Sequence, residues 1–399
     1  MVKKMKKTLT KILFAAAVLF LFGACNDPVF YTVSKAIPRI PPLISGSPTK
    51  FAQIGPYIFV ASGRSLFMYE PALVGGGALV EGEWTQPDAP AGRFWDIAAT
   101  ANYLYAVIEG PGSIGQLWRT DLPITDSSWS IIPLTDKNVQ TIHTTGTGAS
   151  ERLFINTRTG ANSFNIYFFN DTLPLPPLPT QITNFETDDD GTPVFQNHVG
   201  SLLRGAAFDG TNYFLCTLGH IFQTNSSLIN PVSISDDSEY FVGIITLPVS
   251  AHIVTITAGG VLYRVLPGSL NEIAKFEGRR ASGALAVWED GPDRLLLVGR
   301  GDTAYSTTTG RTFGYLEIQF NNTGTFLPAG DPLFRVPGDP DPLIPSTVNN
   351  RANYAASIGS IAINHIVQAA DGKLFASTAS RGAWRYNEDI DQWNAVPRE

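Results

Sequence analysis

The chain has 399 residues, of which 28 are basic and 35 acidic, and its formal net charge is −7 at neutral pH. This acidic balance argues against nucleic acid as a partner, because nucleic-acid-binding domains present a basic surface. Only 16% of the residues are charged, against about a quarter in typical soluble domains. The two cysteines, Cys25 and Cys216, are too few for a disulfide framework.

Residues 1–24 have the composition of an export signal. Five lysines lie at positions 3, 4, 6, 7 and 11, and the apolar run from Ile12 to Phe22 follows with 11 residues. A bilayer-spanning helix needs about 20 apolar residues, so a cleaved leader is favoured over a retained anchor. Removing residues 1–24 takes away five lysines and no acidic residue, which lowers the net charge from −7 to −12.

Leu21-Phe22-Gly23-Ala24-Cys25 resembles the signal of bacterial lipoproteins. The resemblance implies that the thiol of Cys25 carries a lipid, that Cys25 becomes the first residue of the mature protein, and that the protein faces the periplasm or the cell exterior. Two or three acyl chains would hold it firmly on a membrane, because one chain alone binds only marginally. The alternative is an ordinary cleaved leader with an incidental cysteine.

Residues 25–49 form the expected tether between Cys25 and the folded part. Prolines lie at positions 28, 38, 41, 42 and 48, and no hydrophobic period is visible. Proline-rich segments of this kind are extended spacers. We leave open whether residues 28–46 contribute a closing strand to the domain that follows.

Residues 50–399 contain a hairpin-like unit that recurs seven times: an apolar and aromatic strand, a turn, and an apolar pair such as Leu66-Phe67 or Ala304-Tyr305. The seven strands contain Tyr57-Ile58-Phe59-Val60, Tyr103-Leu104-Tyr105-Ala106, Arg152-Leu153-Phe154-Ile155, Tyr213-Phe214-Leu215-Cys216, His252-Ile253-Val254-Thr255, Arg294-Leu295-Leu296-Leu297 and Lys373-Leu374-Phe375-Ala376. A repeat of this kind indicates an array of supersecondary units that stack on one another.

The spacing of the copies predicts the architecture. Four of the six steps between copies measure 39–49 residues, close to one four-stranded propeller blade of roughly 40–45 residues. The two longer steps, of 61 and 79 residues, contain the proline-rich segments 171–197 and 321–350, which we expect to be long loops. We therefore predict an all-β propeller of seven four-stranded blades over residues 50–399, with eight blades as the alternative.

Other segments indicate which strands lie inside and outside. The small apolar stretches 51–54, 97–99, 244–245 and 361–367 fit inner strands, which are buried on both faces. Trp84, Trp129 and Trp393 fit the outer strands.

Residues 306–313, Ser-Thr-Thr-Thr-Gly-Arg-Thr-Phe, resemble the Asp-box of BNR or sialidase-type propellers. Ser306, Gly310 and Thr312 match the pattern, whereas Thr308 replaces its aspartate and Phe313 its tryptophan. In that family the motif is a structural turn, so the resemblance implies a propeller type and no catalytic role.

A sialidase-like glycan hydrolase is the enzymatic alternative. Arg39-Ile40-Pro41 resembles the segment with which that family grips the carboxylate of its substrate, and Arg64 lies roughly where a second functional arginine would follow. Such chemistry needs converging arginines, a tyrosine activated by a glutamate, and an acid/base carboxyl group. No spacing in the sequence singles out that tyrosine and glutamate.

No cofactor or metal site is predicted. The five histidines, at 143, 198, 220, 252 and 365, lie far apart in the sequence and lack the short spacings of zinc sites. Cys216 lies in an apolar run and is interpreted as a buried hydrophobic residue.

The interpretation that these observations favour is a lipid-anchored β-propeller of the bacterial cell envelope that binds a protein, peptide or glycan without catalysis. Its partners would be the membrane, through Cys25, and a ligand bound by loops such as 171–197 and 321–350. The alternatives are the sialidase-like hydrolase and a structural subunit of an envelope complex.

Overall fold

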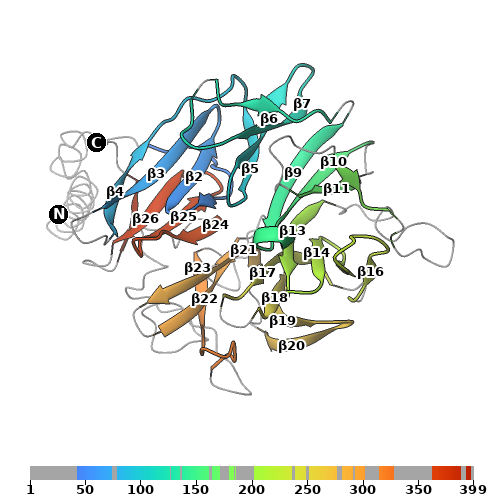
Figure 1. The fold of residues 1–399 in the computed structure, drawn as a ribbon. Coiled ribbons are helices and arrows are strands. Elements are labelled where there is room, and N and C mark those ends of the chain that lie inside the picture. Colours follow the sequence, from blue (N-terminus) through green and yellow to red (C-terminus); the bar gives the residue numbers. More distant parts are fainter. Residues whose placement is uncertain are drawn as a thin grey trace, which may run out of the picture. The chain divides into compact units, whose positions relative to one another are not determined.

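Seven antiparallel sheets succeed one another along the chain and surround a common centre (Figure 1). The computed structural model describes residues 43–73, 79–125, 127–134, 137–160, 164–170, 179–183, 185, 202–235, 239–248, 251–275, 281–290, 293–301, 314–327, 362–387 and 392–396. The fold is an all-β propeller of seven blades, as the repeat predicts.

Each sheet is one blade built from consecutive strands. Blades 1 and 2 comprise β1 (Ala52–Ile54), β2 (Tyr57–Ser62), β3 (Ser65–Leu73) and β4 (Leu79–Thr85), then β5 (Phe94–Ala99), β6 (Leu104–Gly110), β7 (Ile114–Thr120) and β8 (Ser130–Ile131). Blades 3 and 4 comprise β9 (Asn138–Thr145), β10 (Arg152–Arg158), β11 (Phe164–Phe169) and β12 (Thr180–Gln181), then β13 (Leu203–Phe208), β14 (Tyr213–Thr217), β15 (Ile221–Thr224) and β16 (Val232–Ser233).

The remaining three blades follow the same order. Blade 5 comprises β17 (Phe241–Thr246), β18 (Ile253–Thr257), β19 (Val261–Leu266) and β20 (Ser269–Lys275). Blade 6 has β21 (Ala281–Asp290), β22 (Asp293–Arg300) and β23 (Tyr315–Phe320) among its described residues. Blade 7 comprises β24 (Ile363–Gln368), β25 (Leu374–Thr378), β26 (Ala383–Asn387) and β27 (Gln392–Ala395).

The seven predicted apolar strands are the second strands of the blades. In β14, β18 and β25 every residue is buried, because each blade is covered on both faces by its neighbours. A strand in that position reads as a continuous apolar run rather than an alternating one. This burial is why the repeat is visible in the sequence.

The predicted inner strands are also confirmed. The stretches 51–54, 97–99, 244–245 and 361–367 overlap β1, β5, β17 and β24. Trp84 and Trp393 lie in the outer strands β4 and β27, whereas Trp129 lies one residue before the outer strand β8. The Trp129 indole is buried and donates a hydrogen bond of 3.1 Å to the backbone oxygen of Asp88.

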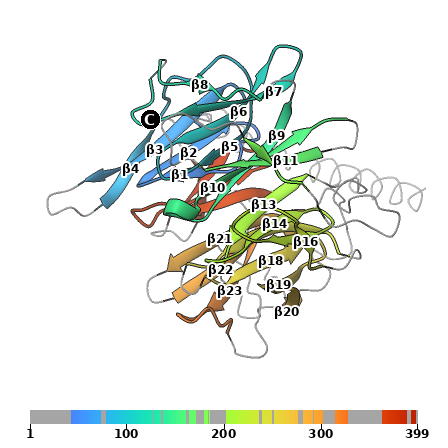
Figure 2. The same cartoon turned by 45° about the vertical axis from the view of Figure 1, so that its right-hand side comes forward.

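Figure 2 shows the same blades turned by 45°. Seven hydrophobic clusters hold the ring together, one between each pair of adjacent blades. Trp288 of blade 6 packs in one cluster with Trp393 of blade 7, and Ile58 of blade 1 packs with Phe375 of blade 7. Blades 6 and 7 are therefore direct neighbours, which leaves no place between them for the eighth blade that the long step 295–374 allowed. Seven blades close the ring.

The described chain starts at the seam between the first and last blades. Leu43 N–H donates to the backbone oxygen of Val396 (3.0 Å), and the backbone oxygens of Ile44 and Gly46 accept from Ala383 (3.1 Å) and Gly382 (2.8 Å). Ile44 is completely buried there. Residues 43–46 thus fasten blade 7 from the N-terminal side, while all four strands of blade 7 come from the C-terminal part of the chain.

Blade 6 corrects one detail of the sequence interpretation. The strand that pairs with β22 among the described residues is β23, from Arg294↔Phe320 to Gly299↔Tyr315, whereas the predicted pair Ala304-Tyr305 lies outside the described residues. The strand Tyr315–Phe320 begins with the apolar pair Tyr315-Leu316 and continues with Glu317, as the repeated unit requires.

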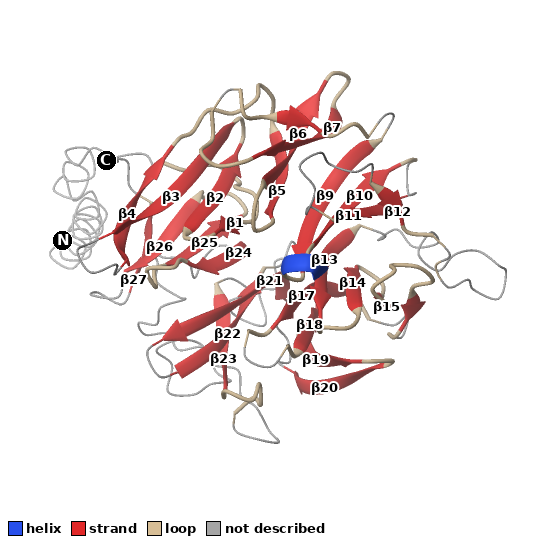
Figure 3. Cartoon of the chain, viewed as in Figure 1, coloured by secondary structure: helices blue, strands red, loops and turns tan. Residues whose placement is uncertain are grey.

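A single 3₁₀ turn, Gly148–Ser150, is the only helical element among the described residues (Figure 3). In that part of the chain, no helix has the length and apolar character needed to cross a membrane.

Candidate functional site

A cavity of about 410 Å³ lies in the central channel and is lined by residues from all seven blades. Gln53, Ala99, His143, Arg204, Ile245, Leu285 and His365 are the contributions of blades 1 to 7 in chain order. Its volume falls within the range of about 300–1,000 Å³ that is usual for small-molecule sites. The cavity is the candidate functional site.

A bulge near the start of the inner strands determines which side chains enter the channel. The pairing of inner with second strands shifts by one residue in five blades, at Trp95, Gln140, Arg204, Val242 and Asn364. Such a bulge re-aims side chains and bends the strand. It creates an equivalent position in each of these blades, directly after the bulged residue.

The residue at this position is polar in one half of the ring and glycine in the other. The position holds His365, Asp96 and Thr141 in blades 7, 2 and 3, and Gly205 and Gly243 in blades 4 and 5. A Cβ on Gly243 would lie 2.3 Å from the backbone oxygen of Gly283, in blade 6. Glycine is needed there because the inner strands of blades 5 and 6 approach closely.

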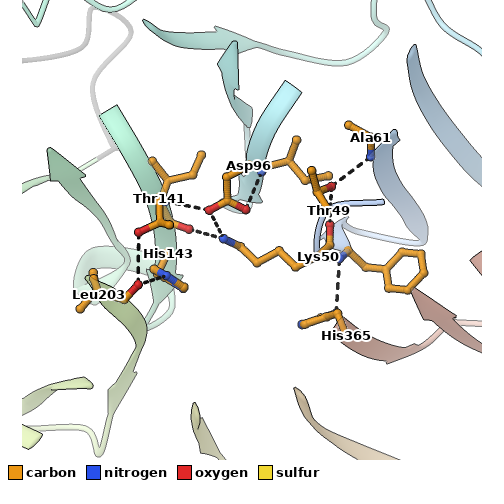
Figure 4. Close-up of polar contacts among 11 residues, drawn as sticks. Thr49, Lys50, Ala61, Asp96, Thr141, His143, Leu203 and His365 are labelled. Carbon is orange, nitrogen blue, oxygen red and sulfur yellow. Dashed lines mark hydrogen bonds and ion pairs between the residues drawn. The ribbon is translucent and has the colours of Figure 1, made fainter. Parts of the chain in front are cut away.

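The polar half of the channel is organised by an ion pair (Figure 4). Lys50 Nζ lies 2.5 Å from Asp96 Oδ2 and 2.5 Å from the backbone oxygen of Ile142, so one side chain of blade 1 reaches blades 2 and 3. Asp96 also accepts hydrogen bonds from Ile97 N–H (2.9 Å) and Ile142 N–H (3.0 Å). Burial lowers the pKa of Lys50, and the charge of Asp96 opposes that shift.

Two histidines stand on either side of this pair. His143 Nε2 lies 3.1 Å from the backbone oxygen of Leu203, and Thr141 Oγ1 donates to the same oxygen at 3.2 Å. Phe51 N–H donates to His365 Nδ1 at 3.3 Å. Burial, together with the charge of Lys50, lowers the pKa of both rings, that of His365 to about 3. Both imidazoles are therefore neutral at pH 7.

Arg204 is the cation of the opposite wall. It is the bulged residue of β13, and its side chain is exposed within the cavity lining. It makes no hydrogen bond or ion pair within the described part of the chain, and desolvation by the surrounding protein lowers the pKa of its guanidinium. A guanidinium without a partner in a cavity is a ready anion site.

The described lining of the cavity contains none of the site residues singled out from the sequence. Arg64 is exposed in the turn between β2 and β3 and does not line the cavity. Cys25, Arg39 and the Asp-box-like residues Ser306, Gly310, Thr312 and Phe313 lie outside the described residues, as do most of the two long segments 171–197 and 321–350. Cys216 is fully buried, as interpreted.

The described lining of the cavity does not assemble the hydrolase set. It contains one arginine, Arg204, and no tyrosine, aspartate or glutamate. Arg300 is completely buried, and Arg264 lies against His252 and the Gly324 backbone oxygen in a separate pocket. The described residues likewise contain no group of three or more His, Cys, Asp or Glu side chains placed to hold a metal ion.

Sequence reasoning missed every charged residue of the channel. His143 and His365 are 222 positions apart and come together only because the ring brings blades 3 and 7 to one centre. The available signal was a lone polar residue inside a small apolar stretch, such as Asp96 in Phe94–Ala99. That signal does not indicate which such residues meet.

Comparisons with known proteins agree with the fold. No protein-family model matches the chain, and no curated protein does. Among solved structures it is similar to the WD40 β-propeller domain of Doa1, with a TM-score of 0.51, 8% identity, and coverage of 86% of this chain and 94% of that one.

Two further structures are similar to the chain. A chain in the crystal structure of a mitotic checkpoint complex gives a TM-score of 0.50 and 11% identity over 87% of this chain and 92% of that one. YCF48 bound to a D1 peptide gives a TM-score of 0.47 and 14% identity over 88% and 95%. At 8% and 11% identity, the likeness to the Doa1 domain and to the checkpoint-complex chain establishes the propeller fold alone.

Proposed function

We propose that the protein is a non-catalytic binding platform of the bacterial cell envelope, held on a membrane by a lipid on Cys25, which binds a protein, peptide or glycan at the propeller face that holds the central cavity. The supporting observation is the cavity itself, which every blade lines and in which the Arg204 side chain has no partner among the described residues. Rigid scaffolds with a concave, partly apolar site are typical of ligand binding.

The channel chemistry supports binding more than catalysis. Asp96 is committed to Lys50 and two backbone N–H groups. His143 and His365 are held neutral, and each already uses one ring nitrogen in a contact with a backbone group. A catalytic acid or base needs a pKa near the working pH and access to the substrate. No described residue of the lining combines the two.

Capture from envelope extracts tests the binding proposal. The full-length protein, purified in detergent, is immobilised and compared with Thr145→Trp, which places an indole in the cavity lining, and with Thr211→Trp in the exposed turn between β13 and β14. We expect the same molecules to be retained by the wild type and by Thr211→Trp and lost with Thr145→Trp. Equal retention by all three proteins would place binding away from the cavity and contradict the proposal.

The membrane anchor has a separate test. We expect the wild type to fractionate with membranes and Cys25→Ala to be released or to remain uncleaved, with mass spectrometry of the mature N-terminus detecting the lipid on Cys25. Membrane fractionation of Cys25→Ala with cleavage before residue 26 would show that the anchor is not a lipid on Cys25.

A further inference from the structure

The charge balance of the central cavity favours an anion. Lys50 and Asp96 neutralise each other at 2.5 Å, and Asp96 is only 7% exposed. His143 and His365 are neutral at pH 7. Among the described residues that line the cavity, this leaves the guanidinium of Arg204 as the cation without a counter-charge.

The position of Arg204 is built into the fold. The bulge in β13 between Leu203 and Gly205 leaves Arg204 outside the regular pairing. On one side, the Leu203 backbone oxygen is fixed by His143 and Thr141, and on the other, Gly205 packs against Ile244. The backbone around Arg204 is therefore held rigidly while its side chain remains exposed. Such preorganisation lowers the entropic cost of binding.

The opposite wall offers a neutral donor. Because His365 Nδ1 accepts the Phe51 N–H, the proton of the neutral ring resides on Nε2. That Nε2–H makes no hydrogen bond within the described part of the chain, and the ring lines the cavity. His365 and Arg204 belong to blades 7 and 4, three blades apart around the ring of seven. A ligand across the cavity would meet a cation at one side and a neutral donor at the other.

The walls between these groups mix apolar and polar side chains. Ala99, Ala206, Ile244, Ile245 and Leu285 line the cavity. The polar groups of Gln53, Thr144, Thr145 and Thr246 lie among them. An extended peptide end carries a carboxylate, one amide carbonyl within reach and a small apolar side chain, which suits this mixture.

We propose that the central cavity binds the C-terminal carboxylate of a peptide or protein, with the carboxylate held by the guanidinium of Arg204 and a ligand carbonyl accepting from His365 Nε2–H. This inference rests on the proposed binding function and names the class of ligand. Arginine is suited to this task because its planar fork matches the two oxygens of a carboxylate.

Paired peptide pools provide the experiment. An N-acetylated random hexapeptide pool with free carboxylates and the same pool with C-terminal amides are passed over immobilised full-length protein, and retained peptides are measured by mass spectrometry. We expect at least about tenfold preference for the free carboxylates, the size of a charge-assisted contact. Peptides chosen from the retained set are then titrated by fluorescence polarisation.

Three variants assign the preference to the cavity. Arg204→Gln should weaken binding at least about tenfold, and Arg204→Lys should restore only part of it, because lysine keeps the charge but loses the fork. Arg64→Gln, in an exposed turn that does not line the cavity, should bind like the wild type. Thermal unfolding should be unchanged in Arg204→Gln, since the side chain has no described partner.

The outcomes separate this inference from the binding proposal. Equal retention of amidated and free peptides, or full binding by Arg204→Gln, would overturn the proposed carboxylate site. The proposed binding function would then still stand or fall by the capture from envelope extracts. If N-acetylneuraminic acid or glucuronic acid binds in an Arg204-dependent way and peptides are not retained, the ligand is a sugar acid and the peptide proposal is wrong. Retention of neither peptide pool refutes the inference.

Discussion

Lys50 Nζ lies 2.5 Å from Asp96 Oδ2, across the boundary between blades 1 and 2, and the same ammonium group reaches the Ile142 backbone oxygen of blade 3. The Lys50 side chain is 20% exposed and that of Asp96 9%. Three blades are thus tied together at the centre of the ring by one cation. Burial disfavours the charged form of lysine, and the negative charge of Asp96 offsets this cost for Lys50.

Asp96→Asn should therefore destabilise the protein by about 3 kcal/mol, because it leaves a largely buried ammonium group without its counter-charge. Glu81→Gln is the matched control, since Glu81 pairs with Arg385 but is 50% exposed, and exposed pairs contribute about 0–1 kcal/mol. Urea unfolding of both variants measures the difference. Similar losses for the two variants would mean that the channel pair is no stronger than a surface pair.

The channel histidines make a second prediction, on pH. The folded protein holds the pKa of His365 at about 3, against 6.5 for the ordinary side chain. Between these values the unfolded chain binds a proton that the folded protein does not, so stability falls as the pH is lowered from 6.5 towards 3. The slope for one histidine is at most about 1.4 kcal/mol per pH unit.

The variant His365→Gln removes this titration while keeping an acceptor for the Phe51 N–H. We expect the free energy of unfolding to depend less steeply on pH in the variant than in the wild type between pH 6.5 and 4. Above pH 7.5 the two pH profiles should run parallel. A constant difference between them over the whole range would show that His365 is not held neutral by the fold.

The fold could be predicted from the sequence because every blade buries its second strand in the same way. Every second strand lies between two neighbouring blades, so strands such as Tyr213–Thr217 and Leu374–Thr378 are apolar throughout. The exception is the third strand of blade 6, because the long connection between Arg300 and Tyr315 separates it from the second strand in the sequence.

The candidate site could not be predicted in the same way. Its charged and histidine side chains come from different blades, and only ring closure brings them together. They are Lys50, just before β1, and His143, Arg204 and His365 in blades 3, 4 and 7. The bulge that places Arg204 in the cavity depends on a pairing shift against Thr217 and Cys216, which no local sequence pattern reports. The resemblance to sialidase-type propellers indicated Arg64 as a candidate, and the structure places Arg64 outside the cavity.

Gly243, on the inner strand of blade 5, gives a third prediction. A Cβ on Gly243 would lie 2.3 Å from the Gly283 backbone oxygen, so Gly243→Ala forces the inner strands of blades 5 and 6 apart. We expect a loss of about 1–3 kcal/mol, the usual cost of overpacking. In Gly259→Ala the nearest atom to the new Cβ would be Thr257 Oγ1 at 3.7 Å, and the change should cost under about 0.5 kcal/mol. Equal thermal shifts for the two variants would contradict the close approach.

The seam between blades 1 and 7 makes the last prediction. Tyr69 Oη donates to Asp371 Oδ2 at 2.6 Å and accepts from Gly82 N–H at 2.8 Å, so one hydroxyl joins β3 to the turn before β25 and to β4. Tyr69→Phe removes both bonds and should cost about 1–3 kcal/mol. Tyr57→Phe is the control, because the Tyr57 hydroxyl has no hydrogen bond among the described residues.

Hydrogen exchange locates the effect of that change. Since the ring closes only where blade 7 meets blade 1, loss of the Tyr69–Asp371 bond should raise the exchange of β1, β2 and β25–β27 before that of blades 3 to 5. The hydrophobic cluster that Tyr69 shares with Ile44, Ile58 and Phe375 remains in the variant, so the seam should loosen rather than open completely. A uniform increase in exchange over all seven blades would mean that the ring unfolds as one cooperative unit and that the seam is not its weakest boundary.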